Sequence, residues 1–203
     1  MLSLTVRPVH SFLSRPAPRG VGGRESKGEL NLPVSETSSK VIYDALKAAD
    51  VGVISALPET WLVHMIRLAD DDPAMTLVRL AKEEEGVGVS TGAHFAGVRS
   101  ALLMQNHGFL QSINGIVSCS LLYKIPLLML VSDRGHLGEP DPWQTEGGRY
   151  TRPVLDALRI VHSELRDQDA VAHQIAEAMT LAQSSLSPVA LLLTRDLMWE
   201  TPQ

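Results

Sequence analysis

The chain has a single cysteine, Cys119, among its 203 residues. One cysteine cannot form a disulfide within the chain, and it excludes a zinc site built from several cysteines. Because Cys119 lies among apolar residues, we expect a buried thiol with a packing role. The chain also lacks an apolar run of the roughly 18 residues that a membrane span needs. With a formal net charge of −5 it has no basic excess, so neither a membrane nor a nucleic acid is an expected partner.

The first 24 residues contain no acidic residue, although they contain four arginines and several serines and prolines. Such a composition is typical of a mitochondrial transit peptide, but the prolines would interrupt the long amphipathic helix of such a peptide. We therefore favour a flexible N-terminal tail over residues 1–37, or an over-long start, ahead of a domain over residues 38–203. The protein is expected in the cytoplasm, or in the mitochondrial matrix if residues 1–24 act as a targeting segment.

From Ser38 onward, short apolar runs alternate with segments of helical spacing. The expected strands are 51–56, 75–80, 100–105, 127–132, 158–162 and 189–194. The expected helices are 40–50, 59–69, 84–96, 109–123, 151–157 and 169–184. This alternation predicts a parallel sheet, and strands that are apolar throughout indicate that both sheet faces are covered. We predict an α/β fold, a three-layer α/β/α domain with a parallel sheet of about six strands, and a long polar loop over 133–149.

The strongest functional signal is the group of three carboxylates at Glu83, Glu84 and Glu85, which follows an apolar strand and precedes a glycine-rich helix. Acidic residues near a helix start interact favourably with the helix dipole, which is a sufficient explanation for Glu84 and Glu85. Glu83 differs because it continues directly from the strand, and open α/β sheets place their chemistry at the carboxyl ends of strands. Glu83 is therefore the candidate catalytic residue.

Two other motifs in this segment imitate known sites. Residues 86–92 read GVGVSTG, but the third glycine comes one residue late for a dinucleotide fingerprint, and three carboxylates would repel a pyrophosphate at that helix start. Residues 88–92 match the Gly-x-Ser-x-Gly pattern of serine hydrolases, whose nucleophile stands on the turn directly after a strand. Ser90 is expected inside the helix instead. We favour neither function and expect the glycines to allow close helix packing.

The order of the motifs resembles the pyrimidine-binding (PYR) domain of thiamine-diphosphate enzymes. Glu83, Gly86 and Gly92 fit the spacing of the glutamate that activates the cofactor and of the small residues that follow it. Residues 105–111, QNHGFLQ, are similar to the Gln-Asn-Ser-Gly-Leu-Gly-Asn of sulfopyruvate decarboxylase α subunits and phosphonopyruvate decarboxylases. The turn SALPETW and the later loop with Arg134 and Gly135 also match, in the same order along the chain.

This resemblance implies a thiamine-diphosphate-dependent 2-oxo acid decarboxylase that acts on 3-sulfopyruvate or a similar anionic pyruvate and gives sulfoacetaldehyde and CO2. Glu83 would hydrogen-bond the pyrimidine N1′ of the cofactor and favour its imino tautomer. The other residues expected at the cofactor are Pro58, Gln105, Asn106 and Gly108. The residues expected at the substrate are Arg134, Asn106 and His107, with the arginine holding the anionic tail.

Two departures from the family pattern leave the substrate open. His107 replaces a usual serine and Leu110 a usual glycine, so bulkier side chains stand on the substrate side. His107 has two interpretations, a catalytic proton donor or a helix-start histidine without chemistry. The alternatives to a sulfopyruvate enzyme are a phosphonopyruvate decarboxylase or another thiamine-dependent carboligase subunit, and a degenerate, non-catalytic PYR module with a binding or regulatory role.

Enzymes of this family hold the cofactor diphosphate through Mg²⁺ on a second (PP) domain that carries a Gly-Asp-Gly motif. This sequence contains no Gly-Asp-Gly. The resemblance therefore implies a separate PP-domain β subunit that supplies the Mg²⁺ ligands, in a hetero-oligomer. The helices expected over 84–96 and 109–123 are the candidates for the interface.

Overall fold

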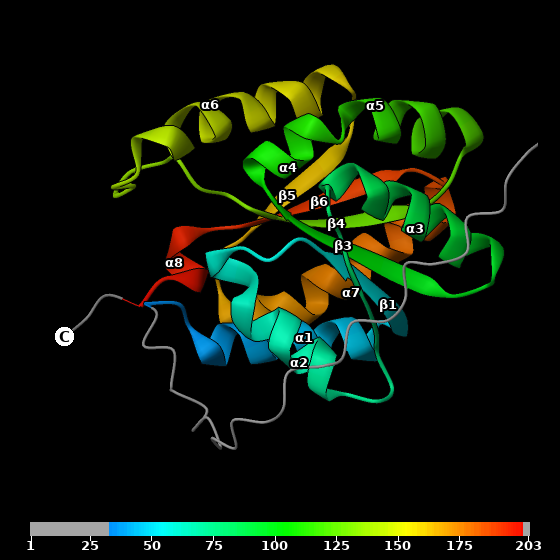
Figure 1. The fold of residues 1–203 in the computed structure, drawn as a ribbon, viewed down its shortest axis with the longest axis horizontal. Helices are drawn as coiled ribbons and strands as arrows, with labels where there is room; N and C mark the ends of the chain where they lie inside the picture. Colours follow the sequence, from blue (N-terminus) through cyan, green and yellow to red (C-terminus); the bar gives the residue numbers. More distant parts are fainter. Residues whose placement is uncertain (1–32, 201–203) are drawn as a thin grey trace, which may run out of the picture. The chain divides into compact units, whose positions relative to one another are not determined.

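The structure is a computed structural model, and it describes residues 33–200 (Figure 1). The tail expected over residues 1–37 lies almost wholly outside this range. Six parallel strands form one sheet in the order β2-β1-β3-β4-β6-β5. The strands are β1 (Val51–Ala56), β2 (Thr76–Arg79), β3 (Arg99–Gln105), β4 (Leu127–Ser132), β5 (Val161–Leu165) and β6 (Pro188–Leu193). An isolated antiparallel bridge joins Val34 to Trp199, so ordered structure begins before Ser38.

Helices cover both faces of the sheet (Figure 1). One face carries α1 (Glu36–Ala48), α2 (Val63–Asp71) and α7 (Gln168–Ser185). The other face carries α3 (Glu83–Phe95), α4 (Asn106–Gln111), α5 (Ile113–Gly115), the π-helical η2 (Ile116–Leu121) and α6 (Pro142–Ala157). Two short helices, η1 (Thr60–Leu62) and α8 (Arg195–Met198), complete the fold. The predicted three-layer α/β/α architecture is confirmed.

The two cores explain why the strands are apolar at every position. In β3, Ala101 and Leu103 point into the core under α1, α2 and α7, whereas Leu102 and Met104 point into the core under α3 to α6. Successive side chains of a strand point to opposite faces, so a strand buried on both sides needs apolar residues throughout. Cys119, predicted to be buried, is only partly buried and packs against the second core.

The prediction of a long loop over 133–149 is wrong, because α6 already begins at Pro142. The first turns of α6 are polar, so they show no apolar periodicity in the sequence. Close packing requires the two glycines of α6: a Cβ on Gly148 would lie 2.1 Å from the Arg134 carbonyl oxygen, and one on Gly147 would lie 2.6 Å from His107 Cε1. The helix expected over 109–123 also begins earlier, at Asn106, and is divided into α4, α5 and η2.

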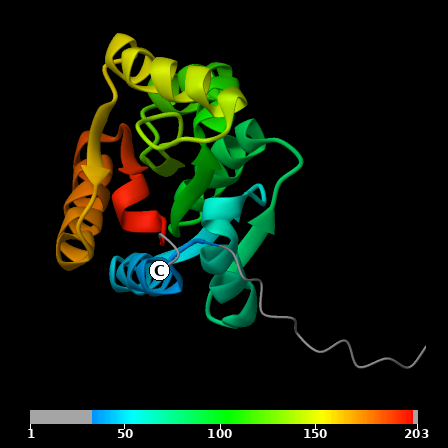
Figure 2. The same cartoon turned by 90° about the vertical axis from the view of Figure 1, so that its left-hand side faces the viewer.

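The carboxyl ends of the strands lie on the left-hand side of Figure 1, and Figure 2 faces them. The segments that leave β1, β3 and β4 there begin with the residues that the sequence singled out. Figure 2 also shows α8 among these strand ends. Within residues 33–200, no helix is both long and apolar enough to cross a membrane.

Candidate functional site

The three carboxylates at the start of α3 have three different environments. Glu85 caps the helix, since its Oε2 accepts hydrogen bonds from the backbone N–H groups of Ala81 at 2.9 Å and Lys82 at 3.4 Å. Glu84 Oε1 accepts a hydrogen bond from Asn114 Nδ2 at 3.2 Å. Glu83 is only 5% exposed, yet no hydrogen bond or ion pair joins it to another residue within 33–200. Glu84 and Glu85 already have partners within the fold, so Glu83 is the carboxylate of the three that can accept a hydrogen bond from a ligand.

Two glycines hold Glu83 in place. A Cβ on Gly86 would lie 2.3 Å from Leu102 Cδ1, so this glycine lets α3 sit directly on β3. A Cβ on Gly108, in the first turn of α4, would lie 2.5 Å from Glu83 Oε1. The missing side chain at Gly108 therefore leaves the space that the Glu83 carboxylate occupies. The structure thus brings together Glu83 and Gly108, two of the residues predicted at the cofactor.

Asn106 is fully buried at the end of β3 and joins three elements. Its Nδ2 donates to Thr151 Oγ1 of α6 at 2.9 Å, and its Oδ1 accepts from the Arg134 backbone N–H at 2.8 Å. Both polar atoms of the Asn106 side chain are therefore hydrogen-bonded within the fold. The geometry favours a scaffold role, and the predicted contacts of Asn106 with cofactor and substrate stay a prediction.

Arg134, predicted to hold the anionic tail of the substrate, has its guanidinium engaged by acidic side chains of its own loop. Its Nη2 lies 2.7 Å from Glu139 Oε1 and 2.8 Å from Asp141 Oδ2, and its Nε lies 3.0 Å from Glu139 Oε2. Burial opposes the charge on Glu139, but hydrogen bonds from Arg134 and from the backbone of Asp141 and Gly135 outweigh it and hold the Glu139 pKa below its ordinary value. The side chain of Arg134 is only 8% exposed. This arrangement favours a role in shaping the loop.

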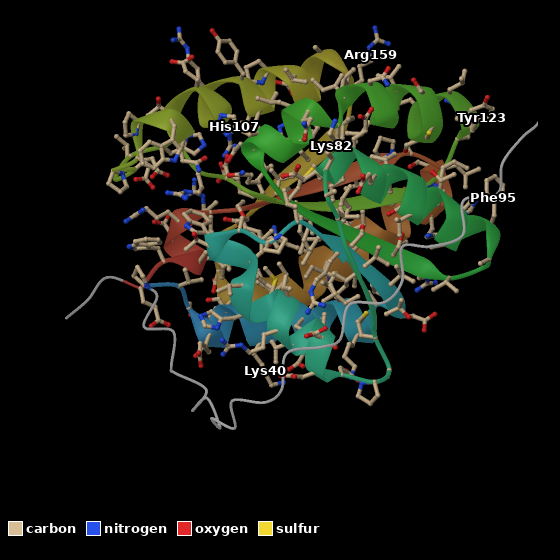
Figure 3. The ribbon with its side chains drawn as sticks, in the orientation of Figure 1. Lys40, Lys82, Phe95, His107, Tyr123 and Arg159 are labelled. Atoms are coloured by element: carbon tan, nitrogen blue, oxygen red, sulfur yellow. The ribbon has the colours of Figure 1, made fainter. Side chains whose placement is uncertain are left out.

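The other predicted site residues lie at the same edge of the sheet as Glu83, Asn106 and Arg134. Gln105 Oε1 accepts a hydrogen bond from Gln144 Nε2 at 3.3 Å. His107, in the first turn of α4, is exposed with its ring against Gly147 of α6 (Figure 3). Pro58 is exposed in the turn that follows β1. His107 is accessible to a ligand, and its predicted catalytic role stays a prediction.

Glu59 is a second carboxyl group at this edge, and it was not among the residues predicted from the sequence. The Ser132 hydroxyl donates to its Oε1, and the Trp61 backbone N–H donates to its Oε2 at 3.0 Å. Burial raises the pKa of Glu59, and the nearby Glu83 charge adds to this, while the two hydrogen bonds and Arg134 oppose it. The sequence pattern that could have identified Glu59 is the one that identified Glu83, a carboxylate shortly after an apolar strand.

The structure excludes the serine-hydrolase interpretation. Ser90 is 1% exposed and lies in the middle of α3, eleven residues beyond the end of β2 at Arg79. A nucleophile elbow instead presents its serine on the turn between strand and helix. In the part of the chain that the structure describes, no group of three or more His, Cys, Asp or Glu side chains is arranged to hold a metal ion.

Comparison with protein families agrees with this geometry. Residues 36–151 match the sequence model of the family described as thiamine pyrophosphate enzyme, N-terminal TPP binding domain. The chain belongs to this family. The matched range of this TPP-enzyme N-terminal domain includes Glu59, Glu83, the segment 105–108 and Arg134, so the whole candidate site lies within it.

Named relatives of this TPP-enzyme N-terminal domain are decarboxylases. It is 35% identical over 163 residues to sulfopyruvate decarboxylase subunit alpha of Methanococcus maripaludis, which covers 80% of this chain and 97% of that subunit. It is 27% identical over 160 residues to phosphonopyruvate decarboxylase of Streptomyces viridochromogenes, covering 77% of this chain and 40% of that protein. Among solved structures, 2-oxoglutarate:ferredoxin oxidoreductase from Magnetococcus marinus shares the fold, with a TM-score of 0.58 at 16% identity over 83% of this chain and 30% of that chain.

Proposed function

We propose that this chain is the alpha subunit of a thiamine-diphosphate-dependent sulfopyruvate decarboxylase. The observation that carries the proposal is the buried Glu83 carboxylate, which has no donor within residues 33–200 and stands at the carboxyl edge of the sheet. The family supports thiamine diphosphate as the cofactor. The alignment with a sulfopyruvate decarboxylase subunit alpha over nearly its full length supports the substrate.

The residues at this edge fit the aminopyrimidine end of thiamine diphosphate. When bound, this cofactor supplies a carbon nucleophile for the 2-oxo group and an electron sink for decarboxylation. Glu83 would hydrogen-bond the pyrimidine N1′, and Gly108 keeps the space that this carboxylate needs. Gln105 and Pro58, at the ends of β3 and β1, would line the same ligand.

The overall reaction breaks the bond between C1 and C2 of 3-sulfopyruvate, releases CO2 and adds one proton to the former C2, giving sulfoacetaldehyde. Glu59 and His107 are two groups near the site that can hold such a proton. For Arg134 we propose a structural role in place of a contact with the sulfonate, because its guanidinium already binds Glu139 and Asp141.

A separate PP-domain β subunit would complete the enzyme. The support is that the relative which the chain matches over 97% of its length is itself a subunit alpha, a name that implies a partner subunit. That subunit would hold the diphosphate and the Mg²⁺. The partner would contact the carboxyl edge, where Glu83 stands.

The test is CO2 release from sulfopyruvate by this chain with thiamine diphosphate and Mg²⁺, with and without the PP-type subunit. Glu83→Gln is expected to lower kcat by at least about 100-fold, since the carboxylate would be lost from the cofactor. Glu84→Gln is the matched control, because its contact with Asn114 lies outside the site. Activity without the partner, or an unchanged rate in Glu83→Gln, would contradict the proposal.

A second candidate substrate is phosphonopyruvate, which the similarity to the Streptomyces enzyme favours. The ratio of kcat/KM for sulfopyruvate and phosphonopyruvate, measured on the same complex, separates the two enzymes. If the assembled complex decarboxylates no 2-oxo acid, the chain is a non-catalytic module and Glu83 serves only the helix.

A further inference from the structure

A cavity of about 540 Å³ lies at the carboxyl edge of the sheet, around the ends of β4, β5 and β6. Most of its lining residues are charged, and six of them are Asp133, Arg152, Glu164, Arg166, Arg195 and Asp196. Glu59, Glu83 and the segment 105–108 of the candidate site instead follow β1, β2 and β3. The strand order β2-β1-β3-β4-β6-β5 therefore places this cavity farther along the same edge.

The cavity lies where the chain leaves nearby strands toward opposite faces of the sheet. After β4 the chain continues into α6 on one face, whereas after β5 it continues into α7 on the other face (Figure 1). Strand β6 lies between these two strands and leads into α8, which Figure 2 shows at this edge. Connections that diverge in this way open a crevice outside the carboxyl ends of the strands, which is where open α/β sheets bind ligands.

The two deeper acidic residues of the cavity are neutralised by basic neighbours. Asp133 Oδ1 contacts His136 Nε2 at 2.8 Å, and Asp133 Oδ2 accepts a hydrogen bond from Arg152. Glu164 Oε1 lies 2.6 Å from Arg152 Nη2, and Glu164 Oε2 accepts a hydrogen bond from Arg166. Each oxygen of these two carboxylates thus already contacts a basic side chain.

The arginines of the cavity, in contrast, keep N–H groups without a partner among the described residues. A guanidinium has five N–H donors, but Arg152 contacts its acids through Nη2 alone, and Arg166 uses only Nε and Nη1. Arg195 forms no ion pair within residues 33–200, and its Nη1 is buried without a hydrogen-bond partner. Its guanidinium lies 4.4 Å from the centroid of the Trp199 ring, which holds it in place. The cavity therefore has more free donors than free acceptors, which favours an anionic ligand.

The size and lining of the cavity indicate the class of this anion. The space is far larger than the roughly 30 Å³ that one water molecule takes in the liquid, so the ligand can carry an organic body beside its charged group. Charged walls favour hydroxyl groups in that body over apolar ones. Several guanidinium groups around one space suit an oxyanion with several oxygens, because charge-assisted hydrogen bonds from arginine to such groups are strong.

We propose that this cavity binds a small hydroxylated organic phosphate or sulfonate, with its oxyanion group among Arg152, Arg166 and Arg195. Arg195 contributes most, because it is the arginine of the three without an acidic partner in the described chain. Asp196 opposes the anion by its charge: its side chain is 71% exposed, and it contacts Arg166 Nη1 at 2.7 Å. The site is separate from Glu83 and requires no thiamine diphosphate.

Isothermal titration calorimetry of the full-length chain, at low ionic strength, tests the site. The probes are glycerol 3-phosphate and 2-hydroxyethanesulfonate, which distinguish a phosphate from a sulfonate as the preferred group. At least one is expected to bind with a Kd below about 1 mM, and added NaCl is expected to weaken the binding, since salt screens charges that are open to solvent.

Three variants locate the anion. Arg195→Gln is expected to raise the Kd by at least about tenfold. Asp196→Asn is expected to lower it by at least about twofold, because it removes a repelling charge and frees Arg166 Nη1. Arg149→Gln is the matched control and should leave the Kd unchanged, since Arg149 lies on α6 with a 70% exposed side chain and does not line the cavity.

Because Arg195→Gln also removes the contact with Trp199, its circular dichroism and urea unfolding are compared with those of the wild type. Asp196→Asn affects only the exposed rim, so it tests the same site with the opposite sign. An Asp196→Asn chain that binds no more tightly than the wild type would contradict the proposal.

No binding of either probe up to about 10 mM, or the same Kd in wild type and Arg195→Gln, would overturn the proposal. A Kd that changes in Glu83→Gln would also overturn it, because the anion would then occupy the candidate site. All of these readouts are affinities of the chain alone, so they hold or fail independently of the decarboxylase activity.

Discussion

At the residue scale, Glu83, Glu84 and Glu85 show how one residue type takes three roles within a single helical turn. Glu85 caps the helix and Glu84 binds Asn114, while Glu83 is buried without a donor among the described residues. All three lie in the first turn of the same helix, so local sequence cannot separate them. What separates them is the direction in which each side chain leaves α3, because only Glu83 turns toward the sheet and α4.

Gly108→Ala tests whether the space beside Glu83 matters. The new Cβ would lie 2.5 Å from Glu83 Oε1, so the carboxylate must move away from the position that suits a ligand. We expect at least about a tenfold loss of kcat in the assembled enzyme, since small misplacements of a positioned group are costly in rate. Gly115→Ala is the control, because its Cβ would press on the flexible Glu84 side chain instead. Equal effects of the two variants would contradict the prediction.

Glu59→Gln tests the raised pKa of Glu59. Above the ordinary value of 4.5 the unfolded chain loses this proton while the folded chain keeps it, so the wild-type free energy of unfolding falls as pH rises toward the folded pKa. Glutamine does not titrate. We expect the stability of Glu59→Gln relative to wild type to improve between pH 4.5 and neutrality, as measured by urea unfolding. A difference that does not change with pH would show that the pKa is not raised.

At the element scale, α3 combines a tightly packed face with an open one, and its glycines differ accordingly. Gly86→Ala would drive a Cβ to 2.3 Å from Leu102 Cδ1, and overpacking of this kind costs roughly 1–3 kcal/mol. Gly88→Ala meets nothing within the described residues and should add roughly 0.5–1 kcal/mol of stability. Urea unfolding at concentrations where the chain is monomeric measures both. The same sign for both variants would contradict the assignment of the faces.

The segment between β4 and α6 is held by the ion pairs of Arg134 with Glu139 and Asp141. Removing one partner of a buried pair leaves an unpaired charge and costs roughly 3–5 kcal/mol. We therefore expect Arg134→Ala to lower the free energy of unfolding by about 3 kcal/mol. Arg149→Ala, at a 70% exposed side chain, should change it by less than about 1 kcal/mol. If Arg134→Ala instead raises KM without loss of stability, the arginine binds substrate after all.

At the scale of the whole molecule, the proposed function requires a second subunit to complete the cofactor site. Under that proposal, Glu83, Gly108, Gln105 and Pro58 would contact the aminopyrimidine, and the PP-domain subunit would hold the diphosphate and the Mg²⁺. We expect the chain alone to bind thiamine diphosphate with Mg²⁺ at least about 100-fold more weakly than the assembled α and β subunits do. Isothermal titration calorimetry on both samples measures this. Equal affinities would show that the chain binds the whole cofactor by itself.

Much of the fold was predictable because burial leaves a direct record in the sequence. The strands β1 and β4 have the predicted bounds, and β2, β3 and β6 lie within one residue of theirs. The predictions failed where polar residues build an element: α6 begins in the stretch read as a loop, and β5 is displaced by three residues from 158–162. In both places apolar and polar residues do not alternate with a clear helix or strand period, so packing against other elements decides the structure.

The sequence by itself determined the α/β class and the resemblance that led to thiamine diphosphate, because these depend on residue order and apolar periodicity. It also indicated that Glu83 follows a strand, although β2 ends at Arg79 and Glu83 is the first residue of α3. Only the tertiary structure decided which polar groups are left for a ligand. In the folded chain Arg134 forms ion pairs with Glu139 and Asp141, and the Asn106 side chain is hydrogen-bonded internally. Folding also places Glu59 at the edge of the sheet where Glu83 lies. The physical reason is that hydrogen bonds and ion pairs act over about 3 Å, and the chain brings these groups that close only after its strands and helices have packed.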